Sequence, residues 1–459
     1  MSRPNILFIT YDQMRYDCVG ASHIRPVKTP NIDRIADNGA YFENCYTPMP
    51  VCCPARQSML TAKRPEQLGA LWNHHGIFPV KHITPETPNF VNRLVENGYN
   101  AEFIGSWEAD PENSPLAYGY KKFISKQEIQ KKIDEKYPDV KYTNSWFGCE
   151  NPVPLEDSFT HTSAKIVINE LEELSKSEKP FFLHIDNTEP HLPVRPSYPF
   201  SNMYNPDEIE RWGTLDDTYE GKPYIHKQQT LNWGLEGKTW EDWKYTVALY
   251  YGLVSQYDDA LGRILDKVEE LGIAENTIIV YTCDHGDMCG SHGYLDKHIC
   301  MYEDILHIPL AIRWDGHIKK QRYDAFCYQC LDVPPTIMNL AGIPLDFPND
   351  GKDLSEYMLN GGDDGRDFAV SAYNGMQFGL MTLRSITTKK YKYVWNLTDI
   401  DELYDLEIDP YELHNLIYDE DKKNVIADLR KKLYYELQRC HDCAISCVGR
   451  VHLLVGKKI

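Results

Sequence analysis

The chain lacks the features that mark several large classes of protein. No stretch of its 459 residues stays apolar over the roughly 20 positions that a membrane-spanning helix needs, so we expect no membrane partner. Lysine and arginine number 48 against 68 aspartate and glutamate, and the net charge of −20 argues against nucleic acid as a partner. No leader pattern precedes the short apolar run before Asp12, so we expect a cytoplasmic protein.

A disulfide framework is also missing. The 13 cysteines are an odd number in a large chain without a leader, and we expect most of them to be reduced. Cys440, Cys443 and Cys447 have a spacing that could hold zinc or an iron–sulfur cluster. Cys327 and Cys330 are distant candidates for completing such a site. Since three clustered thiols leave a fourth ligand undefined, the pattern favours ordinary free cysteines.

Strands and helices alternate over the first three quarters of the chain. Mostly apolar runs predict strands, and amphipathic segments predict helices. The predicted strands are 5–11, 101–104, 181–185, 277–283 and 310–313, and the predicted helices are 29–38, 89–96, 163–175 and 243–271. This alternation is typical of an α/β sheet flanked by helices. Asp12 and Asp284 each follow a predicted strand, at the carboxyl end where ligands of such sheets gather.

The pattern weakens after about residue 345. Short strands are predicted at 368–372, 379–386 and 391–395, followed by a final amphipathic helix at 422–438. We therefore predict two domains, a catalytic domain at 1–345 and a C-terminal subdomain at 346–459.

Residues 52–62 carry the most informative motif, Cys-Cys-Pro-Ala-Arg-Gln-Ser-Met-Leu-Thr-Ala. Pro54 suits the first position of a helix, and no other helix breaker follows up to Ala62. Cys52 is then expected just before a helix N-terminus, where free backbone donors and the helix dipole favour an anion, with Arg56 one turn along. A phosphatase loop, with five residues between Cys and Arg, is excluded because neither Cys52 nor Cys53 has arginine at that spacing.

The run resembles the signature of type I sulfatases: Cys, any residue, Pro, a small residue, Arg, three residues, Leu, Thr and a small residue. Ala62 and Lys63 are small departures from that signature, and residues 402–416 resemble the closing segment of the same family. The resemblance implies an alkaline-phosphatase-like core, with a large central sheet flanked by helices. It also implies a smaller C-terminal domain with a short antiparallel sheet and a helix.

The resemblance further implies that Cys52 is the nucleophile in modified form. In that family a formylglycine-generating maturation enzyme converts the first cysteine of the motif to an aldehyde, whose hydrate attacks sulfur. Cys53 lacks Pro two residues on and Arg four residues on, so we expect the modification at Cys52 alone. Arg56 is expected to stabilise the nucleophilic oxyanion.

A metal site is implied by two residue pairs that follow predicted strands. By resemblance, Asp12, Gln13, Asp284 and His285 hold one divalent cation, and modified Cys52 completes the site. Carboxylate and amide oxygens suit a hard cation, whereas imidazole suits calcium less well and manganese better. Calcium is the ion expected from the family, with manganese or magnesium as alternatives. Many sulfatases have Asp where this chain has Gln13, and Gln occurs there in some sulfatases and in the related phosphonate monoester hydrolases.

Proton transfer and anion binding are assigned to residues farther along the chain. His191, in a loop after a predicted strand, matches the family histidine that protonates the leaving group. Lys297 matches the family lysine that binds the sulfate. Asn73 is expected to donate a further hydrogen bond. His74, His75 and His292 are candidates of lower rank.

Ser106 and Glu108 are the main departure from the family pattern. Most sulfatases have Lys and His at these positions, so this chain loses one cation and gains one anion near the substrate. The leading hypothesis remains hydrolysis of a sulfate ester on a small molecule or carbohydrate. Alternatives are a phosphonate monoester hydrolase or phosphodiesterase with the same site, a non-catalytic binder of sulfated glycans, and a thiol-based or redox protein. Residues 198–251, rich in Tyr and Trp, are expected either to line the substrate mouth or to pack in the core.

Overall fold

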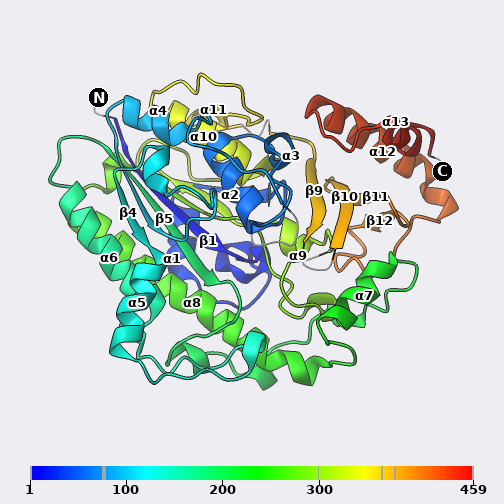
Figure 1. Cartoon of the computed structure of the whole chain (residues 1–459), viewed down its shortest axis with the longest axis horizontal. Coiled ribbons are helices and arrows are strands. Elements are labelled where there is room, and N and C mark those ends of the chain that lie inside the picture. Colours follow the sequence, from blue (N-terminus) through cyan, green and yellow to red (C-terminus); the bar gives the residue numbers. More distant parts are fainter. Residues whose placement is uncertain (1–2, 75–78, 298, 363–364, 377–378, 457–459) are drawn as a thin grey trace.

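The architecture is built around one large mixed β-sheet. The computed structural model describes residues 3–456 except 75–78, 298, 363–364 and 377–378. The sheet has eight strands in the order β4-β3-β5-β1-β6-β7-β2-β8 (Figure 1), and β7 alone runs antiparallel to its neighbours. The strands are β1 (Asn5–Asp12), β2 (Ala40–Tyr46), β3 (Asn100–Gly105), β4 (Lys122–Ser125), β5 (Phe181–Pro190), β6 (Thr277–Cys283), β7 (Leu310–Arg313) and β8 (Gln321–Tyr328).

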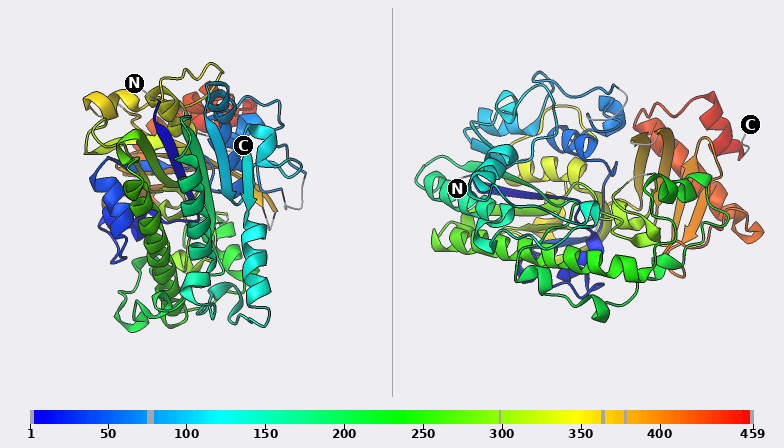
Figure 2. Two further views of the ribbon diagram at one scale, coloured as in Figure 1. Left: turned by 90° about the vertical axis from the view of Figure 1, so that its left-hand side faces the viewer. Right: turned by 60° about the horizontal axis from the view of Figure 1, so that its bottom comes forward.

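Helices cover both faces of this sheet (Figure 2), which explains why central strands such as β1 and β6 are buried along their whole length. One face carries α1 (Pro30–Asp37), α5 (Lys126–Lys136), α6 (Phe159–Leu174) and α8 (Trp240–Glu270). The other face carries α2 (Cys52–Thr61), α4 (Phe90–Glu96) and α10 (Gln329–Leu340). Shorter helices lie in the connections: α3 (Pro65–Leu68), α7 (Tyr224–Asn232), α9 (Glu303–Leu306), α11 (Ser355–Asn360) and α13 (Cys447–Arg450).

A second, four-stranded antiparallel sheet is formed by the C-terminal part of the chain. Its order is β12-β11-β10-β9, with β9 (Ala369–Met376), β10 (Gly379–Thr387), β11 (Tyr391–Asn396) and β12 (Glu402–Asp405). Helix α12 (Lys423–Arg439) packs on this sheet around a hydrophobic cluster that includes Val370, Tyr393 and Leu433. The expected α/β core with a smaller antiparallel sheet and helix is confirmed.

The two sheets meet close to the start of α2. Ser371 Oγ donates to the carbonyl of Thr47 at 2.6 Å, and the Ala372 amide donates to the carbonyl of Pro48 at 2.8 Å. The C-terminal sheet is therefore fixed to the loop that leads into the Cys52 motif. The domain boundary at residue 345 stays a prediction.

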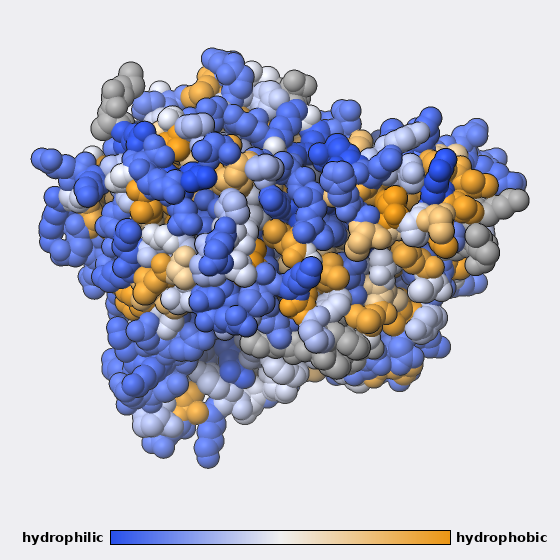
Figure 3. Space-filling model, turned by 45° about the horizontal axis from the view of Figure 1, so that its top comes forward, coloured by the Kyte–Doolittle hydropathy of each residue, from blue (hydrophilic) through white to orange (hydrophobic). Residues whose placement is uncertain are grey.

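The surface is largely hydrophilic. On the face shown in Figure 3, hydrophobic residues form small patches that are most frequent over the C-terminal part of the chain. Among the described residues, no helix combines the length and the apolar character that crossing a bilayer demands.

Candidate active site

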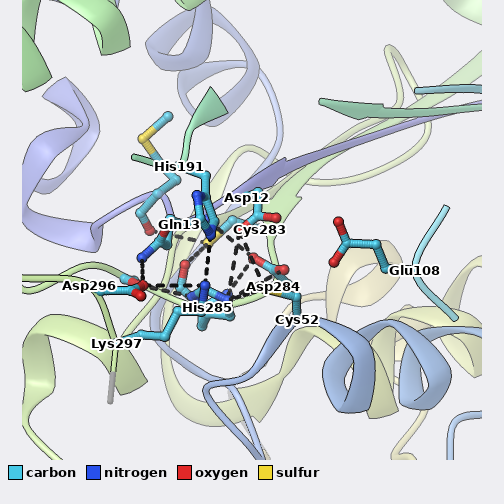
Figure 4. Close-up of polar contacts among 12 residues, drawn as sticks. Asp12, Gln13, Cys52, Glu108, His191, Cys283, Asp284, His285, Asp296 and Lys297 are labelled. Carbon is cyan, nitrogen blue, oxygen red and sulfur yellow. Dashed lines mark hydrogen bonds and ion pairs between the residues drawn. The ribbon is translucent and has the colours of Figure 1, made fainter. Parts of the chain in front are cut away.

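The predicted metal-binding and nucleophile residues come together at the carboxyl ends of the central strands. Asp12 is the last residue of β1, and Asp284 follows β6 directly. Cys52 is the first residue of α2, rather than the residue before it, and Val51 is the N-cap. The Cys52 Sγ lies 3.2 Å from His285 Nε2 and 3.9 Å from Asp12 Oδ1. Figure 4 shows these side chains gathered at one point, with Glu108 to one side.

The chemistry of this group fits a divalent cation. One ligand atom from each of Asp12, Cys52, Asp284 and His285 lies within 4.8 Å of the others. Nδ1 of His285 is 2.9 Å from the Gly286 carbonyl, which makes it the protonated nitrogen and leaves the Nε2 lone pair directed at the group. Carboxylate oxygens with one imidazole nitrogen form a donor set for a hard or borderline metal ion.

Gln13 supplies the strongest sign that a ligand is needed. Its Nε2 donates to Asp296 Oδ1 at 2.6 Å, which fixes the orientation of the amide. Its Oε1 is buried and has no hydrogen-bond partner within the described part of the chain. A buried amide oxygen without a donor costs free energy, and a cation would satisfy it.

Arg56 holds the carboxylates of the site together. Its guanidinium lies 3.0 Å from Asp12 Oδ2 and 3.2 Å from Asp284 Oδ2, and it also pairs with Asp186. Burial raises the pKa of Asp186 to about 7, even though Arg56 acts against this shift. Burial and the nearby charge of Asp12 raise the pKa of Asp284. One guanidinium therefore does not balance the crowded carboxylates, and a further cation would.

The thiol of Cys52 is poorly suited to act as a nucleophile without modification. Burial, followed by the negative charge of Asp12, raises its pKa above the ordinary value for cysteine. The neutral thiol is then the stable form near neutral pH, whereas thiol catalysis needs the thiolate. This observation argues against the alternative of a thiol-based enzyme.

His191 and Lys297 form a pair over this group. Lys297 Nζ lies 2.8 Å from His191 Nε2, and His191 Nδ1 lies 2.7 Å from the Leu192 carbonyl. Burial and Lys297 act to lower the pKa of His191, but Asp12 and a hydrogen bond with Cys52 outweigh them and raise it. In the geometry observed, Nε2 must accept from Lys297 and is unprotonated. The two groups are thus positioned to share a proton with an oxygen placed near both.

The unusual Ser106–Glu108 segment also reaches the site. The Ser106 carbonyl accepts from Arg56 at 3.3 Å, and Ser106 Oγ donates to Glu108 Oε1 at 2.9 Å. A side chain on Gly105 is impossible here, because its Cβ would lie 1.8 Å from the Asp186 carbonyl. The tight approach of β3 to β5 therefore places Ser106 and Glu108 next to Arg56.

Lys126 brings a second cation to this segment. Its Nζ lies 3.2 Å from Glu108 Oε1, while Arg56 Nε lies 4.0 Å from Glu108 Oε2. Burial alone would raise the pKa of Glu108, but Arg56 and Lys126 outweigh it and hold that pKa below the usual range. Glu108 is therefore a carboxylate between two cations.

The structure also places the remaining candidates from the sequence. Asn73 Oδ1 accepts from the Cys53 amide at 2.9 Å, so it helps to hold the start of α2. The lower-ranked His74 approaches the Glu108 carbonyl at 3.2 Å, whereas His292 bonds to Asp217 at 2.6 Å. His75 lies outside the described residues.

Sequence reasoning missed Lys126, Asp186 and Asp296. Asp186 directly follows the predicted strand 181–185, so the rule that found Asp12 and Asp284 could have found it. Lys126 is the first residue of a helix with a Ser125–Glu128 capping box, a signal for the helix but not for the site. The tail cysteines are absent from the group that could bind a metal in the described parts of the chain.

Comparisons with known proteins agree with this geometry. Residues 4–343 match the family model described as "Sulfatase", and residues 290–439 match the one described as "N-sulphoglucosamine sulphohydrolase, C-terminal". The chain is 29% identical to an "Arylsulfatase" of Clostridium perfringens, with 95% of each chain covered. It is 26% identical to an "N-acetylglucosamine-6-O-sulfatase" of Bacteroides thetaiotaomicron, covering 90% of this chain and 82% of that one.

Solved structures show the same fold. The phosphonate monoester hydrolase of Agrobacterium radiobacter superposes with a TM-score of 0.81 at 23% identity, covering 97% of this chain and 98% of that one. The alkaline-phosphatase-like class expected from the sequence is confirmed.

Proposed function

Since the chain belongs to the sulfatase family and is a sulfuric ester hydrolase, we propose that it acts on a sulfated carbohydrate through a formylglycine made from Cys52. The observation that carries this proposal is the placement of Cys52 among Asp12, Asp284 and His285 at the first turn of α2. The curated relative that acts on N-acetylglucosamine 6-O-sulfate supports a sugar as the substrate class.

We further propose that the cation is held by Asp12, Gln13, Asp284 and His285. The unpartnered Gln13 oxygen and the excess of carboxylates over Arg56 support this assignment. When present, the cation supplies positive charge to the sulfate oxygens, and the hydrated aldehyde at position 52 supplies a hydroxyl nucleophile.

The residues around position 52 have distinct roles in this proposal. Arg56, held by three carboxylates, places a fixed guanidinium under the start of α2, where negative charge on the nucleophile is stabilised. Lys297 is buried, and it neutralises charge on the transferring sulfate. His191 Nε2 lies 2.8 Å from Lys297 Nζ. An ester oxygen bound between them would take the place of this contact, and His191, then protonated at Nε2, would give that proton to the leaving group.

Ser106 and Glu108 favour a second candidate, the hydrolysis of phosphonate monoesters or phosphodiesters by the same site. Glu108 partly neutralises Arg56 and Lys126, so the anion-binding field is weaker than a free lysine and histidine would give. A substrate with a different distribution of charge could suit this field. Pure binding without catalysis is less favoured, because Cys52 lies together with Asp12, Asp284 and His285, as a nucleophile beside a cation would.

A parallel assay separates these candidates. The protein is co-expressed with a formylglycine-generating enzyme, and turnover is measured on a sulfated monosaccharide, an aryl sulfate and an aryl phosphodiester. We expect the highest kcat/KM for the sulfated sugar. A higher value for the phosphodiester would support the second candidate, and no turnover of any substrate would support a binder. The maturation enzyme as a partner and the cytoplasmic location remain predictions.

A further inference from the structure

A cavity of about 400 Å³ opens beside His191, outside the group of metal-binding residues. Its walls come from α5, from the segment that contains Tyr142 and Asn151, and from the chain that follows β5 up to Arg195. This volume falls in the range of small-molecule sites and accommodates about one substituted sugar ring.

Two residues join the cavity to the chemistry. His191 lines it while also contacting Lys297. Lys126 lines it while its Nζ contacts Glu108. A substrate whose ester oxygen lies near His191 would therefore extend its remaining atoms into this cavity.

Arg195 is the unusual feature of the wall. Its guanidinium carbon lies 3.9 Å from the centre of the Tyr142 ring, which holds the planar group by stacking. Its Nε is buried without a hydrogen-bond acceptor, and no carboxylate of the described residues forms an ion pair with it. Glu189 is nearby, and Arg195 acts to lower its pKa, but burial outweighs this effect and raises the pKa. The Oε2 of Glu189 accepts from Thr160 at 2.8 Å instead of from Arg195. The positive charge of Arg195 is therefore available to a ligand of the cavity.

Cations that line another cavity behave differently. A cavity of about 710 Å³ near the C-terminal sheet is lined by Arg366 and Lys390. Arg366 pairs with Asp332, and Lys390 lies 2.7 Å from Glu407. In a chain with a net charge of −20, carboxylates are abundant, so a cavity-lining guanidinium without one calls for an explanation.

We propose that this cavity is the subsite for the leaving group, and that Arg195 binds a second anionic substituent of the substrate. The inference rests on the proposed sulfate-ester hydrolysis at Cys52. A stacked guanidinium presents two parallel N–H groups, which match the two oxygens of a carboxylate or of a second sulfate. Gln127, Gln130 and Asn151 supply amides for sugar hydroxyls. Thr188, which also lines the cavity, has a buried Oγ1 that no described residue of the chain hydrogen-bonds.

The test compares Arg195→Gln with Arg211→Gln. Arg211 is exposed, pairs with Asp216 at 2.7 Å and does not line the cavity, so it controls for the loss of one surface charge. The values of kcat/KM are measured on three sulfated monosaccharides: one with no other charge, one with a second sulfate and one with a carboxylate. The preference of the unmutated enzyme between the last two identifies the anion.

We expect Arg195→Gln to lower the ratio of kcat/KM for the doubly charged sugar to that for the singly charged sugar by about 10- to 100-fold, as loss of one charge-assisted contact would. Arg211→Gln should leave this ratio unchanged. Arg195→Lys retains the charge without the planar guanidinium, so its ratio should lie between those of the unmutated enzyme and Arg195→Gln. An unchanged ratio in Arg195→Gln would overturn the inference, as would equal losses on all three sugars with a normal unfolding temperature.

A binding measurement separates this inference from the proposed reaction. The same three sugars are titrated into Cys52→Ala, with and without Arg195→Gln. If no sulfate is turned over but binding of a doubly charged sugar needs Arg195, the proposed reaction fails and the subsite stands. If the sugars do not bind, or bind equally without Arg195, the subsite fails.

Discussion

Two buried arginines in this molecule have opposite surroundings. Arg384, in the C-terminal sheet, meets Asp442 in a double contact of 2.6 and 3.1 Å and also donates to Asn374 Oδ1 at 3.0 Å. One cation there faces one carboxylate, and no other charged group of the described residues forms an ion pair with that carboxylate. Arg56 instead faces Asp12, Asp186 and Asp284, beside the unpartnered oxygen of Gln13.

The difference separates a structural ion pair from a functional one. A balanced pair such as Arg384 with Asp442 needs no ligand, and removing one partner leaves the other charge buried. We expect the unbalanced group around Arg56 to be completed by a cation. Burial of charge is therefore a poor guide to function, whereas an excess of one sign is a useful one.

The largest effect should come from removing one carboxylate in each region. Asp284→Asn should abolish cation binding and lower turnover by more than about 100-fold, since even residues behind metal ligands cost 10- to 100-fold. Asp442→Asn should leave the bound cation in place and lower the unfolding free energy by about 3–5 kcal/mol. Metal analysis and denaturant titration of both variants check this contrast. Full cation occupancy in Asp284→Asn would show that Asp284 is no more a cation ligand than Asp442, and would contradict this comparison.

Neutralising Glu108 tests whether its carboxylate weakens the binding of an anionic substrate near Arg56. Because Glu108 lies between Arg56 and Lys126, Glu108→Gln leaves Lys126 without its carboxylate partner and removes one of the negative charges beside Arg56. We expect KM for sulfated substrates to fall by about 10-fold, the effect of about 1.4 kcal/mol. Glu112, whose side chain is 74% exposed, provides the matched control Glu112→Gln.

The pair Ser106→Lys and Glu108→His goes further, because it restores the two residues usual in the family. We expect it to raise the ratio of sulfate to phosphodiester turnover. If neither this double variant nor Glu108→Gln changes that ratio or KM, the segment has no part in binding substrate.

Another effect concerns pH and a buried histidine behind the site. Burial, with a contribution from Arg56, lowers the pKa of His184 to about 3. Between pH 6.5 and 3 the unfolded chain therefore binds a proton that the folded chain does not. The unfolding free energy should fall as pH falls through this window, by about 1.4 kcal/mol per pH unit from this group.

The variant His184→Phe removes this dependence. Phenylalanine keeps the ring contacts of His184 with Phe8 and Phe103 but loses the bond from its Nδ1 to the Tyr120 hydroxyl at 2.9 Å, so only the pH dependence of the stability difference is compared. The stability difference between His184→Phe and the unmutated protein should shift in favour of the variant as pH falls from 7 to 5. If the unfolding free energies of the two proteins changed equally with pH, His184 would not have the lowered pKa.

Local sequence patterns were sufficient to predict which residues lie at the centre of the site. β1 and β6 are continuous apolar runs, so their ends, and with them Asp12 and Asp284, could be read from the sequence. Cys52 and Arg56 lie within one short motif, so their relation also follows from local spacing.

Other parts of the fold depend on contacts between distant segments. β2 contains Glu43 and Asn44, and β8 is a half-exposed edge strand, so neither has a clear hydrophobic period. The two strands pair in parallel with Cys45 opposite Cys327. This pairing depends on contacts within the folded sheet, which neither segment's local sequence shows.

The same limit applies to side chains of the site. Lys126, which contacts Glu108, and Arg195, which lines the neighbouring cavity, come from segments whose local patterns carry no sign of binding. In the aromatic stretch 198–251, Trp212 and Trp243 are buried in the core while Tyr198 and Tyr224 are exposed, so packing explains much of it.

The central claim is that residue 52 acts as a formylglycine. The most direct measurement is the mass of the peptide containing Cys52 after co-expression with a formylglycine-generating enzyme, taken together with sulfate-ester turnover of the same sample. The account predicts an aldehyde in place of the thiol at position 52, turnover proportional to the modified fraction, loss of both in Cys52→Ala and retention of both in Cys53→Ala. Full turnover by Cys52→Ala, or by protein in which residue 52 is still a thiol, would contradict it.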